Sequence, residues 1–430
     1  FLCFTILVGI HELGHFLMAR AFKIRVEKFY IFFDPWFSLF KFKRGDTEYG
    51  LGWLPLGGYV KIAGMIDESM DKEQMKQPVK PDEFRAKPAW QRLLVMVAGV
   101  MMNVLLAIVT YCAVCYTWGD SYFSNQDAKW GYNFNPTAHE MGFRDGDRFV
   151  SIDGEEIDNV MRVQNDLLIT DGGRRVIVER GGEPVTLDIP FESLLRMRQE
   201  KAYEDLFTLR LPFIVDSVSY TSAVEAGLES GDEVVAIDDL RDADYPRYRD
   251  YLQKHKNDKV LLTVRRDGAL IDSLALPVDA EGRIGVTVTN PYSLRTQYYT
   301  FWESIPAGIH KAGKTISSYW DQLKLIVQPK TKMYEELGGF VAIGSIFPSS
   351  WDWHDFWLKT AFLSIILAVM NLLPIPGLDG GHALFTLWEI ITRRKPSEKF
   401  LEVAQYVGLM IILALLVYAN GNDIYRFFIK

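Results

Sequence analysis

The sequence predicts a polytopic α-helical membrane protein with four transmembrane helices, a membrane-associated β-hairpin region and two mixed α/β domains outside the membrane. Two observations predict this fold class. Long apolar runs alternate with polar blocks, although the average of 49% apolar and 24% charged residues is that of a soluble protein. One polar block also contains two copies of the same motif. A length of 430 residues is consistent with two to four domains.

Four segments are long and apolar enough to cross a bilayer core of about 30 Å, at a rise of about 1.5 Å per residue. They are residues 1–20, 91–118, 356–380 and 400–419. The third segment contains Pro374 and Pro376 close to its end, where glycines also gather. We expect the helix to break there, because proline removes a backbone donor. Broken helices at membrane depth are tolerated where they line a polar site.

The first segment carries three ionisable residues, His11, Glu12 and His15, within the apolar run 1–18. Each such group costs at least about 2.5–3.5 kcal/mol at the centre of a membrane helix. Histidines four residues apart share one helix face and can hold one metal ion, while Glu12 can take a proton from the activated water. A chance motif on a surface helix is the first alternative, but such a helix alternates apolar and charged residues. A signal peptide is the second, but no basic stretch precedes the run.

A third metal ligand must come from elsewhere, because a catalytic zinc usually has three protein ligands and one open position. Asp379 and His382 are the candidates, since both lie in the broken part of the third segment. Capping of a helix is the competing role for Asp379, and imidazole is the commoner zinc ligand, so chemistry alone leaves both open. Asn103 is the polar residue of the second segment. For Asn103 we favour a helix–helix hydrogen bond over a catalytic role.

Residues 22–90 form a polar, basic connection whose part from Arg25 to Ile62 is rich in strand-forming aromatic residues interrupted by glycine. This pattern predicts β-hairpins at the membrane interface or dipping into it, in a cytoplasmic, membrane-reentrant β region. Basic residues cluster in 20–92 and again at Arg393–Lys395. The clusters place both connections in the cytoplasm, so the block between the second and third segments lies on the other side.

That block contains a repeat, since the motif from Ala138 to Asp147 returns from Ala223 to Asp232, 85 residues later. Each copy is followed by an alternating strand and a turn, and the pattern resembles two PDZ domains in tandem, at 120–200 and 201–292. A PDZ domain binds an extended peptide by adding it to a sheet edge. Two roles stay open at this point: binding of peptide termini, or exclusion of large substrates. Residues 299–327 then form an amphipathic helix, expected on the membrane surface or against the PDZ pair.

Three motifs together resemble the site-2 protease family of intramembrane zinc metalloproteases. They are HELGH in the first segment, GGYVK in the following loop, and N-x-x-P-x-x-x-L-D-G in the third segment. The resemblance implies a Zn²⁺ cofactor with His11, His15 and Asp379 as ligands, and Glu12 as general base. It also implies that substrate is held by Asn371 and by the strand residues Gly57, Gly58, Tyr59, Val60 and Lys61. One departure concerns the second segment, where the family often has A-G-P-x-x-N and this chain has Val100 in place of the proline.

The function implied by this resemblance is that of a metalloendopeptidase. It cleaves within the transmembrane segment of a single-span membrane protein, such as a pre-trimmed anti-sigma factor or a remnant signal peptide, in regulated intramembrane proteolysis. The implied location is the bacterial cytoplasmic (inner) membrane, with multiple passes through the lipid bilayer and the PDZ domains on the periplasmic side. A net charge of −8 gives no reason to expect nucleic acid.

Two other functions compete with that of a protease. A membrane-anchored scaffold with a structural zinc would need four protein ligands, and only three good candidates occur. A soluble thermolysin-like protease is incompatible with four spanning segments.

Overall fold

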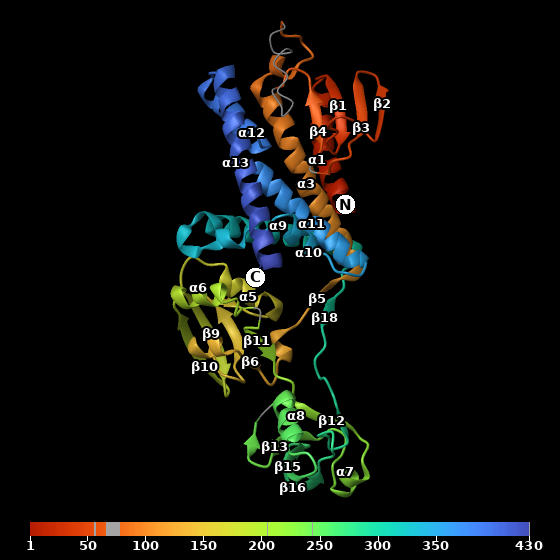
Figure 1. Ribbon diagram of the computed structural model, residues 1–430, viewed down its shortest axis with the longest axis vertical. Helices are drawn as coiled ribbons and strands as arrows, with labels where there is room; N and C mark the ends of the chain where they lie inside the picture. Colours follow the sequence, from red (N-terminus) through yellow and green to blue (C-terminus); the bar gives the residue numbers. More distant parts are fainter. Residues whose placement is uncertain (56, 66–77, 204, 243, 430) are drawn as a thin grey trace. The chain divides into compact units, whose positions relative to one another are not determined.

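The computed structural model of the chain describes residues 1–55, 57–65, 78–203, 205–242 and 244–429 (Figure 1). These residues form two compact units. The first unit combines Phe1–Asp120 with Gln297–Lys430, and the second is Ser121–Thr296. The second unit is therefore an insertion into the first.

Four helices of the first unit are long and apolar enough to cross a membrane. They are α1 (Leu2–Ala21), α3 (Ala89–Trp118), α11 (Trp353–Leu372) and α13 (Glu398–Ile424). Each of the four predicted spanning segments overlaps one of these helices, and the chain is a polytopic membrane protein with additional β-structure. Helix α3 lies at the centre of the unit and packs against α1, α11 and the shorter helix α12 (Asp379–Thr392).

The third predicted segment, 356–380, is not one continuous helix. Helix α11 ends at Leu372. A separate helix, α12 (Asp379–Thr392), begins after a turn of six residues, 373–378. The intervening prolines cannot donate the backbone hydrogen bonds that would continue α11. Helix α12 starts with Asp379-Gly380-Gly381, which the sequence pattern did not identify as helical because glycine is a poor helix former. A side chain at Gly380 would lie 2.3 Å from the carbonyl oxygen of Leu373, so the tight turn requires glycine there.

A four-stranded sheet lies between α1 and α3 in the sequence. Its strands are β1 (Val26–Ile31), β2 (Phe40–Arg44), β3 (Thr47–Leu51) and β4 (Tyr59–Ile62), in the order β2-β3-β1-β4. Strands β2 and β3 form an antiparallel hairpin, as predicted, but β1 runs parallel to β3. Strand β4 pairs with β1 alone among the described residues, so it forms an edge of the sheet.

The amphipathic helix predicted at 299–327 is α9 (Phe301–Val327). It begins with a capping box, in which Thr300 and Glu303 satisfy each other's free backbone donors. Its small residues Gly308 and Ala312 face α3, and a side chain at Gly308 would lie 2.5 Å from Cys112. The helix therefore packs on the central membrane helix. The short helix α10 (Phe340–Ser345) follows it.

The second unit contains two similar halves, each with its own hydrophobic core. The first half comprises β6 (Tyr132–Phe134), α4 (Pro136–Glu140), β7 (Arg148–Ile152), β8 (Glu155–Glu156), α5 (Val163–Leu168), β9 (Arg174–Arg180), β10 (Glu183–Ile189), α6 (Phe191–Gln199) and β11 (Phe207–Leu209). The second half comprises β12 (Phe213–Val218), α7 (Thr221–Glu225), β13 (Glu233–Ile237), β14 (Leu240–Arg241), α8 (Tyr245–Lys254), β15 (Lys259–Arg266), β16 (Ala269–Pro277) and β17 (Val286–Val288). The connections to the first unit, β5 (Asp120–Tyr122) and β18 (Arg295–Gln297), pair with each other.

The repeated Gly-Asp of the sequence motif has the same structural role in both halves. Asp147 accepts two hydrogen bonds from Arg180, each of 2.7 Å, and Asp232 accepts bonds of 2.6 and 2.7 Å from Arg266. Both aspartates are almost fully buried. Burial alone would raise the pKa of Asp232, but the bonds from Arg266 and from the backbone of Glu229 lower the pKa below its usual value. In each half, the aspartate therefore links the turn after the short helix (α4 or α7) to the arginine at the end of a strand (β9 or β15).

The boundary predicted at residue 200 does not separate the two halves. Strand β11 (Phe207–Leu209) pairs with β6 of the first half, and Leu206 is buried in the first core. The first half therefore extends past residue 200, because a strand of only three residues carries too little periodicity to be assigned from sequence.

Candidate active site

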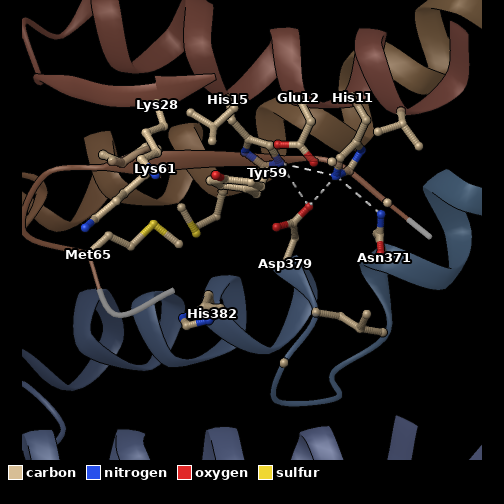
Figure 2. A pocket seen from close by; sticks show the side chains of 18 of the residues that line it. His11, Glu12, His15, Lys28, Tyr59, Lys61, Met65, Asn371, Asp379 and His382 are labelled. Carbon is tan, nitrogen blue, oxygen red and sulfur yellow. Dashed lines mark hydrogen bonds and ion pairs between the residues drawn. The ribbon is translucent and has the colours of Figure 1, made fainter. Parts of the chain in front are cut away.

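A cavity of about 510 Å³ lies in the first unit and is lined by α1, β4, the segment before α12, and α12 itself (Figure 2). All the residues to which the sequence assigned a role line it. They are His11, Glu12, His15, Gly57, Gly58, Tyr59, Val60, Lys61, Asn371 and Asp379. Residues more than 350 positions apart along the chain thus meet in one place.

Three of these side chains converge on one point. The Nε2 atoms of His11 and His15 lie 3.3 Å apart, and Asp379 Oδ2 lies 3.1 Å from the first and 3.2 Å from the second. Two ligand atoms bound tetrahedrally to zinc at about 2.0–2.1 Å are about 3.3–3.4 Å apart. Asp379 Oδ2 is also buried without a hydrogen-bond partner in the described part of the chain. The three atoms therefore fit one face of a tetrahedral zinc site, with a fourth position left for water or substrate.

Close packing of α1 against α3 makes room for the two imidazoles. A side chain at Gly14 would lie 2.4 Å from the carbonyl oxygen of Ala98. A side chain at Gly99 would lie 2.3 Å from His15 Nε2 and 2.7 Å from His11 Cε1. The absence of a Cβ atom at Gly99 thus leaves the space that both rings occupy. Helix α3 is continuous through Val100, the position where the family pattern has proline.

Each imidazole is oriented through its other ring nitrogen. His15 Nδ1 lies 2.8 Å from the carbonyl oxygen of Val95, so this nitrogen carries the proton and Nε2 is free to bind a metal. His11 Nδ1 lies 3.2 Å from Asn103 Nδ2, while Asn103 Oδ1 is buried and has no partner among the described residues. Turning the amide over would let Asn103 Oδ1 accept a hydrogen bond from His11 Nδ1 and satisfy both groups. The helix–helix bond expected of Asn103 therefore has a candidate metal ligand as its partner.

The two candidates for the third ligand lie at different distances from the two histidines. Asp379, the first residue of α12, belongs to the group whose ligand atoms lie within 4.8 Å of one another, with His11 and His15. His382 lines the cavity one turn later but lies apart from this group (Figure 2). The helix cap is Leu378, so capping is not the role of Asp379.

Glu12 and strand β4 are neighbours in the cavity. Figure 2 shows the carboxyl group of Glu12 between the two imidazoles, facing the same space. A side chain at Gly58 would lie 2.6 Å from Val8 and 3.1 Å from Glu12 Cγ, so the chain entering β4 is in direct contact with the helical turn that carries Glu12. The edge of β4 and a carboxylate able to move protons thus line the same cavity.

Two side-chain amides complete the cavity wall. Asn371 Nδ2, from the end of α11, lies 3.4 Å from His11 Nε2. Gln405 of α13 also lines the cavity, and sequence analysis did not identify it. A glutamine within an otherwise apolar membrane segment was the available signal, since burial of an amide in lipid is costly.

Comparison with known proteins identifies the chain. The sequence profile described as "Peptidase family M50" matches residues 1–415. A "Putative zinc metalloprotease" of Clostridium perfringens is 29% identical and aligns with 98% of this chain and 96% of its own length. The "Regulator of sigma E protease" of Haemophilus influenzae is 27% identical, with 98% and 97% aligned. A "Putative zinc metalloprotease" of Vibrio cholerae is 29% identical, with 98% and 96% aligned.

These matches extend over almost the whole chain, including the three motifs that contribute to the cavity. They agree with the resemblance drawn from HELGH and from the motif in the third segment. The relatives all come from bacteria, and this agrees with the expectation that the chain is a bacterial membrane protein. The chain belongs to peptidase family M50 and is a zinc metalloprotease embedded in a membrane.

Proposed function

We propose that the chain hydrolyses a peptide bond within the transmembrane segment of single-span membrane proteins. The observation that carries the proposal is the convergence of His11, His15 and Asp379 within helices apolar enough to cross a bilayer. Ionisable groups at this depth are costly unless they serve a site. A substrate whose cleaved bond lies in the membrane can reach such a site without leaving the lipid bilayer.

His11, His15 and Asp379 would hold the zinc ion, which supplies Lewis-acid activation of a water molecule and of the scissile carbonyl. Glu12 takes the proton from the attacking water and delivers it to the leaving amine nitrogen. The carbonyl of Val95 and the amide of Asn103 keep the two imidazoles in the tautomer that presents Nε2.

The substrate segment must unwind before it can be cut, because helical carbonyls are engaged in hydrogen bonds to residue i+4. Strand β4 offers an edge whose backbone groups can replace those bonds, as in β-augmentation. Gly58 precedes the strand, and its missing Cβ atom lets the chain entering β4 lie against the turn of α1 that carries Glu12. Gly57 stands before it, with a φ of +153° that favours glycine. Asn371, 3.4 Å from His11, can hold the segment close to the scissile bond.

The second unit governs which substrates enter. Its similar halves follow the order expected of tandem PDZ domains, and they are inserted through the paired strands β5 and β18. The second half has a groove of about 320 Å³ lined by α8, residues 281–284 and β17, which suits a peptide terminus. In the first half, Leu194 and Met197 of α6 are buried in the core beside α5. We assign peptide binding to the second half and exclusion of large substrates to the unit as a whole.

The proposed location is the bacterial cytoplasmic membrane, with the second unit on the periplasmic side. The basic clusters at 20–92 and 393–395 support this orientation. The Haemophilus influenzae relative is called a regulator of sigma E protease, and this name supports a pre-trimmed anti-sigma factor as substrate. A remnant signal peptide has the same chemistry, namely one short apolar span with little mass outside the membrane.

The substitution Glu12→Gln tests the proposal. It keeps the shape of the side chain and removes the proton acceptor, so zinc content should stay at one ion per chain while cleavage of a single-span reporter is abolished. Glu140→Gln is the matched control, because Glu140 is exposed in the second unit, and it should cleave at the parent rate. Cleavage at the parent rate by the Glu12→Gln variant would overturn the assignment.

A further inference from the structure

Helix α13 carries one buried amide that faces the cavity. Gln405 is 7% exposed, whereas Val407 and Met410 on the same helix are 52% and 63% exposed. Its side chain lines the same cavity as His11, His15 and Asp379. No hydrogen bond of the Gln405 amide occurs within the described part of the chain. The residue is largely buried, but its amide opens to the cavity, so a ligand bound there can supply the hydrogen bonds that the described residues do not.

The backbone of α13 holds Gln405 in this place. A side chain at Gly408 would lie 1.3 Å from the carbonyl oxygen of Pro376, so the two backbones are in direct contact there. Residues three positions apart share a helix face, so Gln405 and Gly408 face the same side. That side is the turn leading to Asp379. Gln405 is therefore fixed on the wall of the cavity formed by residues 377–379.

The proposed substrate geometry creates a need for such a group. Backbone N–H and C=O groups of an extended segment point alternately to its two edges. A segment paired with β4 has one edge satisfied, and the groups on its other edge remain without partners. Each unpaired backbone group is costly where water is excluded. A glutamine amide has both donors and an acceptor, so it can replace a neighbouring peptide group.

We propose that Gln405 binds the backbone of the unwound substrate at the edge turned away from β4, so that the substrate strand is held from both sides. This role rests on the proposed function and adds a substrate-binding residue from the fourth membrane helix. The ligand class is an extended polypeptide segment, and recognition is independent of its side chains.

Kinetics of Gln405→Leu provide the first test. Loss of one hydrogen bond to the substrate should lower kcat/KM about three- to tenfold, with zinc content unchanged. The control Met410→Leu changes an exposed residue of the same helix by a volume-conserving swap and should keep the parent kcat/KM.

Crosslinking provides the second test. It tests the contact between Gln405 and the substrate even if the Gln405→Leu variant loses zinc and its kinetics cannot be interpreted. Gln405→Cys is combined with Glu12→Gln, with the three native cysteines replaced, and single cysteines are placed along the span of a reporter. Disulfides should form at every second reporter position near the scissile bond, because an extended strand presents alternate residues to one side. No disulfides, or disulfides spaced by three and four residues, would overturn the proposal.

The two hypotheses fail in different ways. If the Glu12→Gln variant still cleaves the reporter, the proposed function itself is wrong. If Glu12→Gln is inactive while Gln405→Leu holds zinc and keeps the parent kcat/KM, only the role of Gln405 is wrong.

Discussion

The substitution Gly99→Ala should displace the two proposed histidine ligands without weakening the helix that carries Gly99. The added Cβ atom would lie 2.3 Å from His15 Nε2 and 2.7 Å from His11 Cε1, whereas ordinary contacts begin at 3.4 Å. The rings must therefore retreat by about 1 Å, twice the tolerance of about 0.5 Å for a functional site. A displacement of about 1 Å costs on the order of 100-fold in rate. Alanine also improves helix propensity by about 1 kcal/mol, so lost helicity cannot explain a defect.

The assay measures zinc per chain and kcat/KM on a single-span reporter with the same purified protein. Gly99→Ala should bind zinc more weakly and lose at least about 100-fold in kcat/KM. Gly9→Ala is the matched control, because Gly9 lies on α1 two residues before His11. Among the described residues its Cβ atom would meet only Ile31, at 3.7 Å. A Gly99→Ala variant with the parent zinc affinity and rate would refute the packing argument.

Three further predictions follow from particular contacts. Asn103→Leu removes the bond to His11 Nδ1 and should weaken zinc binding about 10- to 100-fold, measured by competition with a chelator; unchanged affinity would contradict the orienting role. Arg266→Met leaves Asp232 buried without its partner and should destabilise the second half by about 1–3 kcal/mol, seen as faster hydrogen exchange there and not in the first half. The fold lowers the pKa of Asp232, so the ionised Asp232 stabilises the folded state above the unfolded pKa of about 3.9. This stabilisation is lost as pH falls through the folded pKa, and Arg266→Met should weaken that pH dependence of stability. Replacement of residues 121–296 by a short linker should permit cleavage of an untrimmed reporter, and unchanged discrimination would count against the size filter.

The membrane helices and half of the candidate site could be predicted from sequence because their signals are local. His11, Glu12 and His15 lie within five positions of one apolar run, and their cost in lipid makes them conspicuous. The third proposed ligand is harder to assign from sequence. Asp379 and His382 share one segment, and the choice between them depends on where α12 begins and how it meets α1. That is a tertiary property which residue chemistry alone leaves open.

Asn103 and Gln405 show why the rest of the site escaped prediction. Both lie in helices that are apolar on every side, so the sequence gives no periodic signal for the face that meets the site. Asn103 was recognised as a helix–helix contact, but its partner depends on the rotation of α3 about its axis. Gln405 faces the cavity because Gly408 brings α13 against Pro376.

The presence of β-strands between the first two membrane helices could be predicted from sequence, but the order in which the strands pair could not. Aromatic residues and glycines indicated hairpins, and β2 and β3 form one. The parallel pair of β1 and β3 needs a crossover, and β2 provides it by lying on the outer side of β3. In the second unit, β11 returns to the first half, because its register is set by contacts with β6 and not by its own short pattern.

The central claim is that a zinc site formed by His11, His15 and Asp379 cuts a peptide bond inside a membrane span. The most direct test is mass spectrometry of the products formed from a single-span reporter by the purified chain in lipid bilayers. We predict two products whose masses sum to the reporter plus one water, with the cut inside the apolar span, and no products from the Glu12→Gln variant. Products cut only outside the span, or identical products from both proteins, would contradict the account.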